Sequence, residues 1–556
     1  MSTPYGSMAV EAWIEPTGGQ WRPAGPNDTW LDLGIVAVHA ALLRKVGHTE
    51  IEMWSPPRQR NADGSPEPDP LRPGQWLWNV FGLDDVESRA LDVDTLLVRD
   101  RPMDAAPGAH KMNIFCSGSA HLPDGRLFVV GGHIIPKSRA GGGPSDNAGH
   151  VHVYDPVQPA GWTLVPQPLD PIRWYPTVTG LPDGRMLITS GSRGVLEGNL
   201  NDHKATGYWN QINNDYAVFD PATWRMLDTG PVTLVDDARL APGDQRLATY
   251  PAVFVLPRTP GDGTVIALVE TNRAWLYTYE PGATGPLNRA DALYPMHTLG
   301  SRSYPTYGSM VLLPLEPGGN RARILAVGGQ HESNTDYRSL DPDQASTATA
   351  EILDLDMTRA LTTQPGWRQT QPLRHARVLC DTTLLADGTV LVSGGSERGW
   401  GDQNSGPVYD AELFDPESET FSAAARAATD RRHHSTALLQ PDGTVVKAGS
   451  TGGFGDLRDA HGYVWLDVHT DAERYFPPYL WRGPRPSVVG IEAEAGPTLR
   501  YGSAFTVVAS GDSLDAGSRL TYRRGATGRL PARRGGQRWR AVGGKSRSGR
   551  ATLRAP

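Results

Sequence analysis

The sequence predicts an all-β protein, and two observations support this fold class. Glycine (63 residues) and proline (47 residues) are abundant without a collagen-like period, and 16 Trp and 18 Tyr residues accompany them. Such a composition suits many short strands joined by tight turns. In addition, one hairpin-like unit recurs along the chain, with turn aspartates at positions 124, 183, 262, 387 and 442. Helices are expected to be scarce.

Each repeated unit joins hydrophobic residues, an Asp-Gly turn, a run of β-branched residues and a pair of small residues, as in LPDGRLFVVGGH from Leu122. Asp-Gly supplies the positive φ angles that a tight hairpin needs, and Val and Ile favour strands. Further copies begin at Leu181, Leu384 and Leu438, weaker copies begin at Val255 and Leu312, and a degraded copy covers residues 35–54.

A second motif follows several of these hairpins and predicts the next strand of each repeat. It reads VHVYDP where it ends at Pro156, and its other copies end at Pro221, Pro281 and Pro416. The spacing is that of Kelch repeats with inserted loops. We therefore expect a Kelch-type β-propeller over residues 25–483, with six to seven blades and seven as the expected number. N- and C-terminal strands sharing one blade would close the ring and protect its edges. Unrelated hairpins of a β-sandwich are the alternative.

The two ends of the chain differ from the repeats. Residues 1–24 form an N-terminal segment, and residues 484–520 read as the start of a small immunoglobulin-like β-sandwich that is cut short. Residues 521–556 hold eleven Lys and Arg residues and no Asp or Glu. We expect this basic Arg/Gly-rich tail to be disordered and without strands. An altered reading frame in a GC-rich gene would produce such a tail; nucleic-acid binding is not expected, because Trp539 is its single aromatic beyond Tyr522.

Composition also limits the class of protein. No run approaches the about 20 apolar residues of a membrane span, and the first residues lack the basic and apolar regions of a signal peptide. The chain as it stands reads as cytoplasmic, or as secreted or cell-surface if its start is truncated.

Two cysteines, Cys116 and Cys380, are too few for a disulfide framework. We expect a monomer.

Two residues that precede successive hairpins are the first candidates for chemistry. Cys116, after Phe115, lies just ahead of one hairpin, and Tyr175, after Arg173 and Trp174, holds the corresponding place one blade later. Considered singly, each has an ordinary interpretation: Cys116 as a small buried hydrophobe, like Cys380, and Tyr175 as an aromatic residue at the edge of a strand.

These two segments resemble the copper radical oxidases, the family of galactose oxidase and glyoxal oxidase, and the resemblance covers most of residues 25–490. It implies a thioether bond between Cys116 and Tyr175. The tyrosine modified in this way would bind copper and hold a radical. A single copper ion moves one electron, so a two-electron oxidation needs such a partner. Copper and the Cys-Tyr radical cofactor are therefore the expected cofactors.

The resemblance also points to a His-His pair before the last hairpin. His434 matches a histidine ligand of the family, whereas His433 stands where the family has an axial tyrosine that takes the substrate's proton. Imidazole can serve as a ligand or as a base. Neighbours on a regular strand point to opposite faces, so both can reach one metal only where the chain is irregular. The alternative places one imidazole in solvent and the other at a turn.

Other parts of the family's site are changed. The stretch from Arg524 to Thr527 begins like the approach to the last histidine ligand, but no histidine follows His469. Arg193 occupies the place of the aromatic that stacks on the modified tyrosine, and Trp209 is a candidate substitute. Four further histidines show no ligand spacing and are interpreted as ordinary polar loop or rim residues: His110, His121, His133 and His150.

Two functions of different classes follow. The leading hypothesis is a copper-dependent oxidase in which Cys116, Tyr175 and His433 are catalytic, and Tyr175, His434 and His433 bind copper. It would oxidise a primary alcohol, an aldehyde or a carbohydrate and reduce O2 to H2O2. The altered copper site favours the rival, an inactive propeller that binds glycans or protein partners through its loops.

Overall fold

The protein is described by a computed structural model. It describes residues 17–493 apart from the segments given next, together with residues 504–510, 523–524, 528–529 and 548–554. Within residues 17–493, the segments outside the description are 46, 62, 64, 71–73, 75, 79–85, 104–112, 134–148, 167, 194–211, 228–232, 236, 241–246, 257–263, 282, 284, 305, 316–319, 331–340, 402, 458–461 and 482–486.

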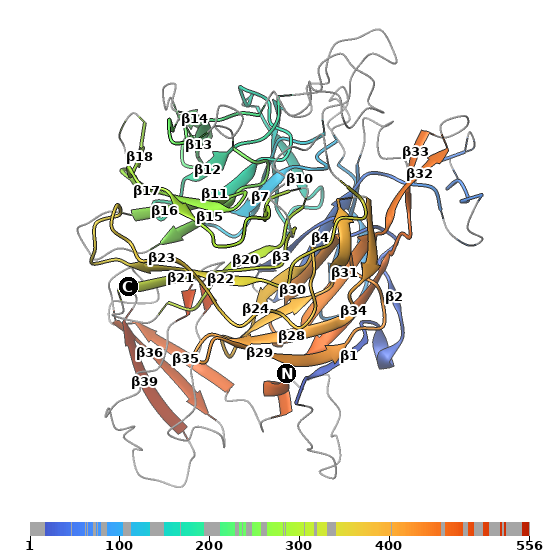
Figure 1. Ribbon diagram of the computed structural model, residues 1–556. Coiled ribbons are helices and arrows are strands. Elements are labelled where there is room, and N and C mark those ends of the chain that lie inside the picture. Colours follow the sequence, from blue (N-terminus) through green and yellow to red (C-terminus); the bar gives the residue numbers. More distant parts are fainter. Residues whose placement is uncertain are drawn as a thin grey trace.

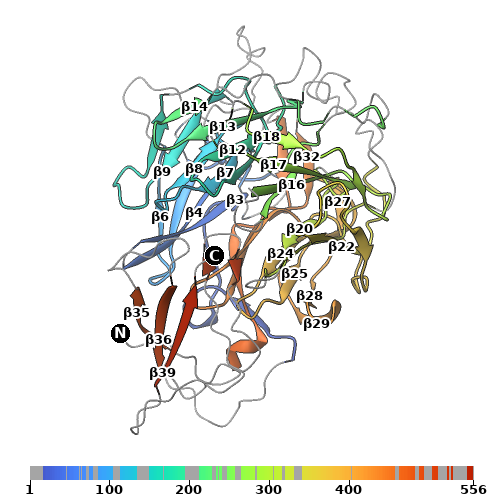
Figure 2. The same cartoon turned by 90° about the vertical axis from the view of Figure 1, so that its left-hand side faces the viewer.

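Seven antiparallel four-stranded sheets form the blades of a propeller (Figures 1 and 2), as the repeats predict. Each repeated hairpin supplies the first two strands of a blade, because its turn, which is Asp-Gly in five of the seven, reverses the chain between two hydrophobic runs. The first four blades are β3 (His39–Lys45), β4 (His48–Ser55), β5 (Glu87–Asp92), β6 (Val98–Asp100); β7 (Gly118–His121), β8 (Leu127–Val130), β9 (Val151–Tyr154), β10 (Trp162–Val165); β11 (Thr177–Gly180), β12 (Met186–Thr189), β13 (Tyr216–Asp220), β14 (Arg225–Leu227); and β15 (Ala252–Leu256), β16 (Thr264–Glu270), β17 (Arg273–Tyr279), β18 (Leu287–Arg289).

The remaining three blades continue the same order. They are β20 (Ser309–Leu312), β21 (Arg321–Val327), β22 (Ala350–Asp356), β23 (Gly366–Gln369); β24 (Asp381–Leu384), β25 (Val390–Ser393), β28 (Asp410–Asp415), β29 (Thr420–Arg426); and β30 (His433–Leu439), β31 (Val445–Thr451), β34 (Asp471–Phe476), β1 (Gln20–Pro23). Two short strands, β2 (Leu31–Asp32) and β19 (Tyr294–Pro295), pair beside β34 and β17. First strands of neighbouring blades lie against one another, as β7 against β11 and β24 against β30, and so they surround the centre of the ring.

The last blade closes the ring. Its outermost strand β1 pairs with β34 from Gln20 opposite Phe476 to Pro23 opposite Glu473. The indole of Trp21 donates a 2.9 Å hydrogen bond to the carbonyl of Ala425 in the neighbouring blade. Strands from both ends of the propeller therefore share one blade, as expected for a ring without free edges.

A buried arginine precedes the first strand in four blades, at positions 173, 302, 377 and 431. Arg377 shows the pattern: its guanidinium donates to the carbonyl of Gly394, at 3.1 Å, after the second strand and to Glu412, at 2.7 Å, on the third. The counterparts pair with Asp215, Glu351 and Asp471. Because a buried charge needs a partner, these ion pairs fix the segments that approach the centre of the ring.

Gly-Gly pairs of the repeats join one blade to the next. Gly328 has a φ of +65°, and a Cβ atom there would lie 2.3 Å from the carbonyl oxygen of Arg377. The amide of Gly329 donates to that same carbonyl at 2.9 Å. Gly131 and Gly394 approach the carbonyl oxygens of the arginines in their next blades in the same way. Glycine is required at these positions because a Cβ atom would clash and because φ is positive.

Two further sheets accompany the blades. Loops of the sixth and seventh blades extend into a common sheet of β26 (Ser396–Trp400), β27 (Gln403–Pro407), β32 (Gly453–Leu457) and β33 (Gly462–Leu466). A separate three-stranded sheet lies beside the propeller (Figures 1 and 2) and comprises β35 (Ser487–Ala493), β36 (Ala504–Ser510) and β39 (Ser548–Arg554).

The prediction that no strand lies beyond residue 520 is wrong. Besides the short pair β37 (Arg523–Arg524) and β38 (Gly528–Arg529), β39 pairs with β36 over its whole length. Antiparallel pairing uses backbone N–H and C=O groups, which every residue except proline supplies, so composition is a weak guide here. Described helices are limited to short 3-10 turns, η2 (Pro26–Asp28) and η7 (Pro478–Trp481). No helix in the described part of the chain could span a bilayer.

Candidate active site

A cavity of about 460 Å³ lies where the first strands of six blades begin, β3 among them. Segments preceding or opening β7, β11, β15, β20 and β30 supply most of its wall. All four residues predicted from the sequence line it: Cys116, Tyr175, His433 and His434. The structure therefore brings together side chains that are more than 300 residues apart in the sequence.

Cys116 and Tyr175 occupy equivalent positions, each two residues before the first strand of its blade. Both have a φ of +62°, and the amide of Tyr175 donates a 3.0 Å hydrogen bond to the carbonyl of Cys116. Their side chains are buried in one cluster with Phe115 and Trp174. A left-handed conformation is costly for residues other than glycine, and such strain is typical of functional sites. The geometry fits the predicted pairing of the two side chains.

The aromatic that covers Tyr175 is Trp174, its own neighbour in the sequence. The two ring centroids are 4.7 Å apart and the planes differ by 17°. Adjacent side chains on a regular strand point apart, and the positive φ of Tyr175 removes that restriction. Trp209, the substitute suggested from the sequence, lies outside the described residues. Arg193 hydrogen-bonds to Asn213.

His433 and His434 both face the cavity, because the chain is irregular there. His434 has a φ of +61°, and the pairing of β30 with β31 passes from His433 opposite Thr451 directly to Ser435 opposite Gly449. The two imidazole centroids are 3.7 Å apart, and His433 is only 2% exposed. The alternative that one of these rings lies in solvent is not what the structure shows. From the sequence, both rings were expected to reach one metal only if the strand is irregular at this point, and the structure shows that it is.

One contact fixes the orientation of His434. Its Nδ1 lies 3.0 Å from the hydroxyl of Thr451, on the adjacent strand β31. The indole of Trp465, from β33, packs 4.7 Å from the same imidazole. With Nδ1 engaged, Nε2 is the nitrogen that can serve as a metal ligand.

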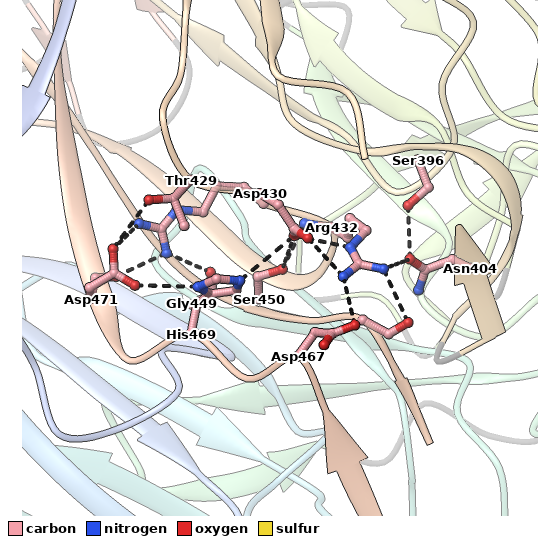
Figure 3. Close-up of polar contacts among 12 residues, drawn as sticks. Ser396, Asn404, Thr429, Asp430, Arg432, Gly449, Ser450, Asp467, His469 and Asp471 are labelled. Carbon is pink, nitrogen blue, oxygen red and sulfur yellow. Dashed lines mark hydrogen bonds and ion pairs between the residues drawn. The ribbon is translucent and has the colours of Figure 1, made fainter. Parts of the chain in front are cut away.

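A polar network anchors the chain immediately before the two histidines (Figure 3). Arg432 donates to Asp430 at 3.0 Å through its guanidinium and to Ser450 at 2.8 Å through its amide. Ser450 in turn donates to Asp430 at 3.3 Å. Arg431 contacts Asp471 at 2.8 Å. Side chains from two neighbouring strands therefore hold the backbone that presents His433.

Three residues of the wall were not identified from the sequence. Burial lowers the pKa of His39 to about 3, and its neutral Nε2 accepts a 3.0 Å hydrogen bond from the amide of Cys116. Burial also raises the pKa of Tyr250 well above its usual value; its hydroxyl donates to the carbonyl of Ser117 at 2.9 Å. Tyr304 donates to the hydroxyl of Tyr175 at 3.1 Å. His39 belongs to the degraded first repeat, and nothing in the sequence marks its proximity to Cys116.

The other sequence candidates are not part of this wall. His121 is exposed and contacts the carbonyl of Leu42, as expected of a rim residue. His133 is instead buried, and its ring stacks on Phe115 with centroids 5.9 Å apart. Cys380 is a buried small hydrophobe, and burial raises its thiol pKa to about 11. His110 lies outside the described residues.

The residues present suit a copper ion. Two imidazoles and the phenol of Tyr175 bring nitrogen and oxygen donors to one cavity, and Cu(II) prefers such donors in tetragonal arrangements. Within the described ranges, no group of three or more His, Cys, Asp or Glu side chains could hold a metal.

Comparisons with known proteins find similar oxidases. The family described as Glyoxal oxidase N-terminus matches residues 246–479. Aldehyde oxidase GLOX of Vitis pseudoreticulata is 25% identical over 405 residues, covering 71% of this chain and 66% of that protein. Galactose oxidase of Gibberella zeae is 24% identical over 539 residues, covering 91% of this chain and 62% of that protein. The chain is therefore similar to the copper radical oxidases.

A solved structure confirms the fold. A novel fungal alcohol oxidase of the AA5 family, in complex with copper, superposes with a TM-score of 0.61 at 18% identity, covering 97% of this chain and 93% of that one. Aldehyde oxidase GLOX1 of Arabidopsis thaliana is 24% identical over 515 residues, covering 88% of this chain and 70% of that protein. The chain spans slightly less than two thirds of the length of the first-named GLOX relative and of galactose oxidase.

Proposed function

We propose that this protein is a copper-dependent oxidase that converts a primary alcohol or an aldehyde and passes the two electrons to O2, forming H2O2. The observation that carries the proposal is the convergence of Cys116, Tyr175, His433 and His434, from three blades, on one buried cavity. An inactive scaffold has no physical reason to hold a thiol, a stacked phenol and two imidazoles together.

Tyr175, His434 and His433 would hold the copper. When bound, copper would accept one electron, and Tyr175 joined to Cys116 would accept the second electron of a two-electron oxidation. The thioether forms when the Cys116 S–H and a ring C–H of Tyr175 are replaced by an S–C bond, and O2 takes the two hydrogens.

The protein's other groups would bind substrate and move its proton. The cavity admits a small molecule between its tyrosines and apolar residues such as Val178, Ala252 and Met310. His433, when released from copper, would accept the proton of the substrate hydroxyl, since free imidazole can act as a base. Burial of the site excludes bulk water from Tyr175, which is 8% exposed.

The test is the intact mass of the full chain after aerobic loading with Cu(II). We expect a loss of two hydrogens that disappears in Cys116→Ala and persists in Cys380→Ala, the matched control at the other buried cysteine. An unchanged mass in the copper-loaded wild type would contradict the proposed cofactor, and it would leave the inactive propeller as the better description.

A further inference from the structure

The phenol of Tyr304 lies among the candidate copper ligands. Its hydroxyl is 3.1 Å from the hydroxyl of Tyr175, and the two ring centroids are 4.7 Å apart. The ring of His433 lies 6.2 Å from the ring of Tyr304. Tyr304 therefore lines the cavity beside both Tyr175 and His433.

The position of Tyr304 follows from the repeat. In the third, fifth and seventh blades, the residue two places after the buried arginine lines the cavity: Tyr175 after Arg173, Tyr304 after Arg302 and His433. The sequence Arg-x-Tyr-Pro-Thr occurs at residues 173–177 and again at residues 302–306.

The buried guanidinium of Arg302 is fixed in the same way as its counterparts. It donates to the carbonyl of Gly328 and lies 3.3 Å from Glu351. Side chains at equivalent positions of a ring of blades point toward the same centre. The arrangement of Tyr304 beside Tyr175 is therefore set by rigid parts of the fold.

We propose that Tyr304 is a further copper ligand, which supplies a second phenolic oxygen to the site. This inference rests on the proposed function. Oxygen donors bind first-row divalent ions at about 2.0–2.2 Å, so two of them at a right angle are about 3 Å apart. The 3.1 Å between the hydroxyls of Tyr304 and Tyr175 matches that spacing.

The proposal also completes the donor set. Tyr175, His433 and His434 give two nitrogens and one oxygen, and Tyr304 adds the second oxygen of an N2O2 set that suits Cu(II). His433 occupies the place where the resemblance predicts an axial tyrosine. Tyr304, which lies in a different blade from His433, would supply the phenol that His433 replaces.

The experiment is a titration of the purified full chain with Cu(II) in competition with a chelator, read out by dissociation constant and by EPR. Tyr304→Phe is expected to weaken Cu(II) binding at least tenfold and to change the EPR spectrum, because a direct ligand is lost. Thermal unfolding of the variant checks that it folds. Tyr304→His, which restores a donor, is expected to bind Cu(II) more tightly than Tyr304→Phe.

Tyr250→Phe is the matched control. The Tyr250 ring packs edge-on against Tyr175 at 5.1 Å, but its hydroxyl donates to the carbonyl of Ser117. This variant should keep the wild-type EPR spectrum and bind Cu(II) within about twofold of the wild type. The inference would be overturned if wild type and Tyr304→Phe bound Cu(II) with equal affinity and gave equal EPR spectra. It would also be overturned if Tyr250→Phe lost as much Cu(II) affinity as Tyr304→Phe. Failure of the proposed function is distinct, because the wild type itself would then bind no copper or would lose no hydrogens after copper loading.

Discussion

The indole of Trp174 stacks on the phenol of Tyr175, the next residue in the chain, at 4.7 Å with the planes within 17°. The indole therefore covers one face of the ring that is proposed to carry the radical. Its other neighbour is His133, whose ring centroid is 4.9 Å away. This contact gives the first prediction.

Trp174→Leu should expose Tyr175. Loss of the buried indole is expected to destabilise the fold by about 2–3 kcal/mol and to raise the rate at which tetranitromethane nitrates Tyr175 several-fold. Peptide mass mapping measures the nitration, and Trp162→Leu, which alters a buried indole in another cluster, is the control. Equal nitration of Tyr175 in both variants would show that the stack does not shield it.

Thr451→Val should weaken copper binding without removing a ligand. The change deletes the hydroxyl that orients His434 through Nδ1 and keeps the shape of the side chain. Loss of such a partner typically costs about 10–100-fold in metal affinity. Chelator competition measures it. Thr444→Val, in the turn before the same strand, is the comparison, and it should leave the affinity as in the wild type.

Gly328→Ala should be strongly destabilising. The added Cβ would lie 2.3 Å from the Arg377 carbonyl, at a φ of +65°, so both contact and conformation oppose it. We expect a loss of about 2–4 kcal/mol in the free energy of unfolding. Gly180→Ala is the control, because its nearest neighbour would be 3.9 Å away. Denaturant unfolding compares the two, and similar midpoints would contradict the proposed contact between blades.

Asp471 should make stability depend on acid pH. Burial acts to raise its pKa, but the hydrogen bond with His469 and the charge of Arg431 outweigh it and lower the pKa to about 2. A carboxyl with a lower pKa in the folded state stabilises the fold above its unfolded pKa of about 3.9, and this contribution is lost as the pH falls toward 2. Asp471→Asn should cost about 2 kcal/mol at pH 7 and progressively less below pH 4. A cost that is independent of pH would contradict this linkage.

Cys380 should be inert toward thiol reagents in the folded protein. Burial raises its pKa to about 11, so almost no thiolate is present at pH 8. Maleimide labelling followed by mass spectrometry should show no modification of Cys380 until denaturant is added. Rapid labelling of the native protein at this residue would show that its surroundings open.

Much of the fold could be predicted because its hairpins carry a local signal. The Asp-Gly turns and β-branched runs identified the first two strands of five blades. The weaker copy from Leu312 and the degraded copy over residues 35–54, which have no Asp-Gly turn, marked the other two. Strand β39 was missed because its pairing with β36 depends on backbone groups and not on composition.

The site was only partly predictable. Cys116, Tyr175, His433 and His434 could be identified through the resemblance, but the stack of Trp174 depends on a positive φ that no pattern reveals. His39 and Tyr250 reach the cavity from other blades, and their burial required the structure. Tyr304 did leave a signal, because Arg-x-Tyr-Pro-Thr occurs twice, yet only the ring places the two copies side by side.

The pairing of β1 with β34 has a consequence for synthesis on the ribosome. Residues 20–23 emerge early, but their partners at residues 473–476 are among the last of the propeller to appear. Until then the nascent chain carries an unpaired strand, and the neighbouring blades lack a complete seventh member. Cotranslational folding can build the earlier blades one by one, whereas the cavity, which needs His433 and His434, can form only at the final step.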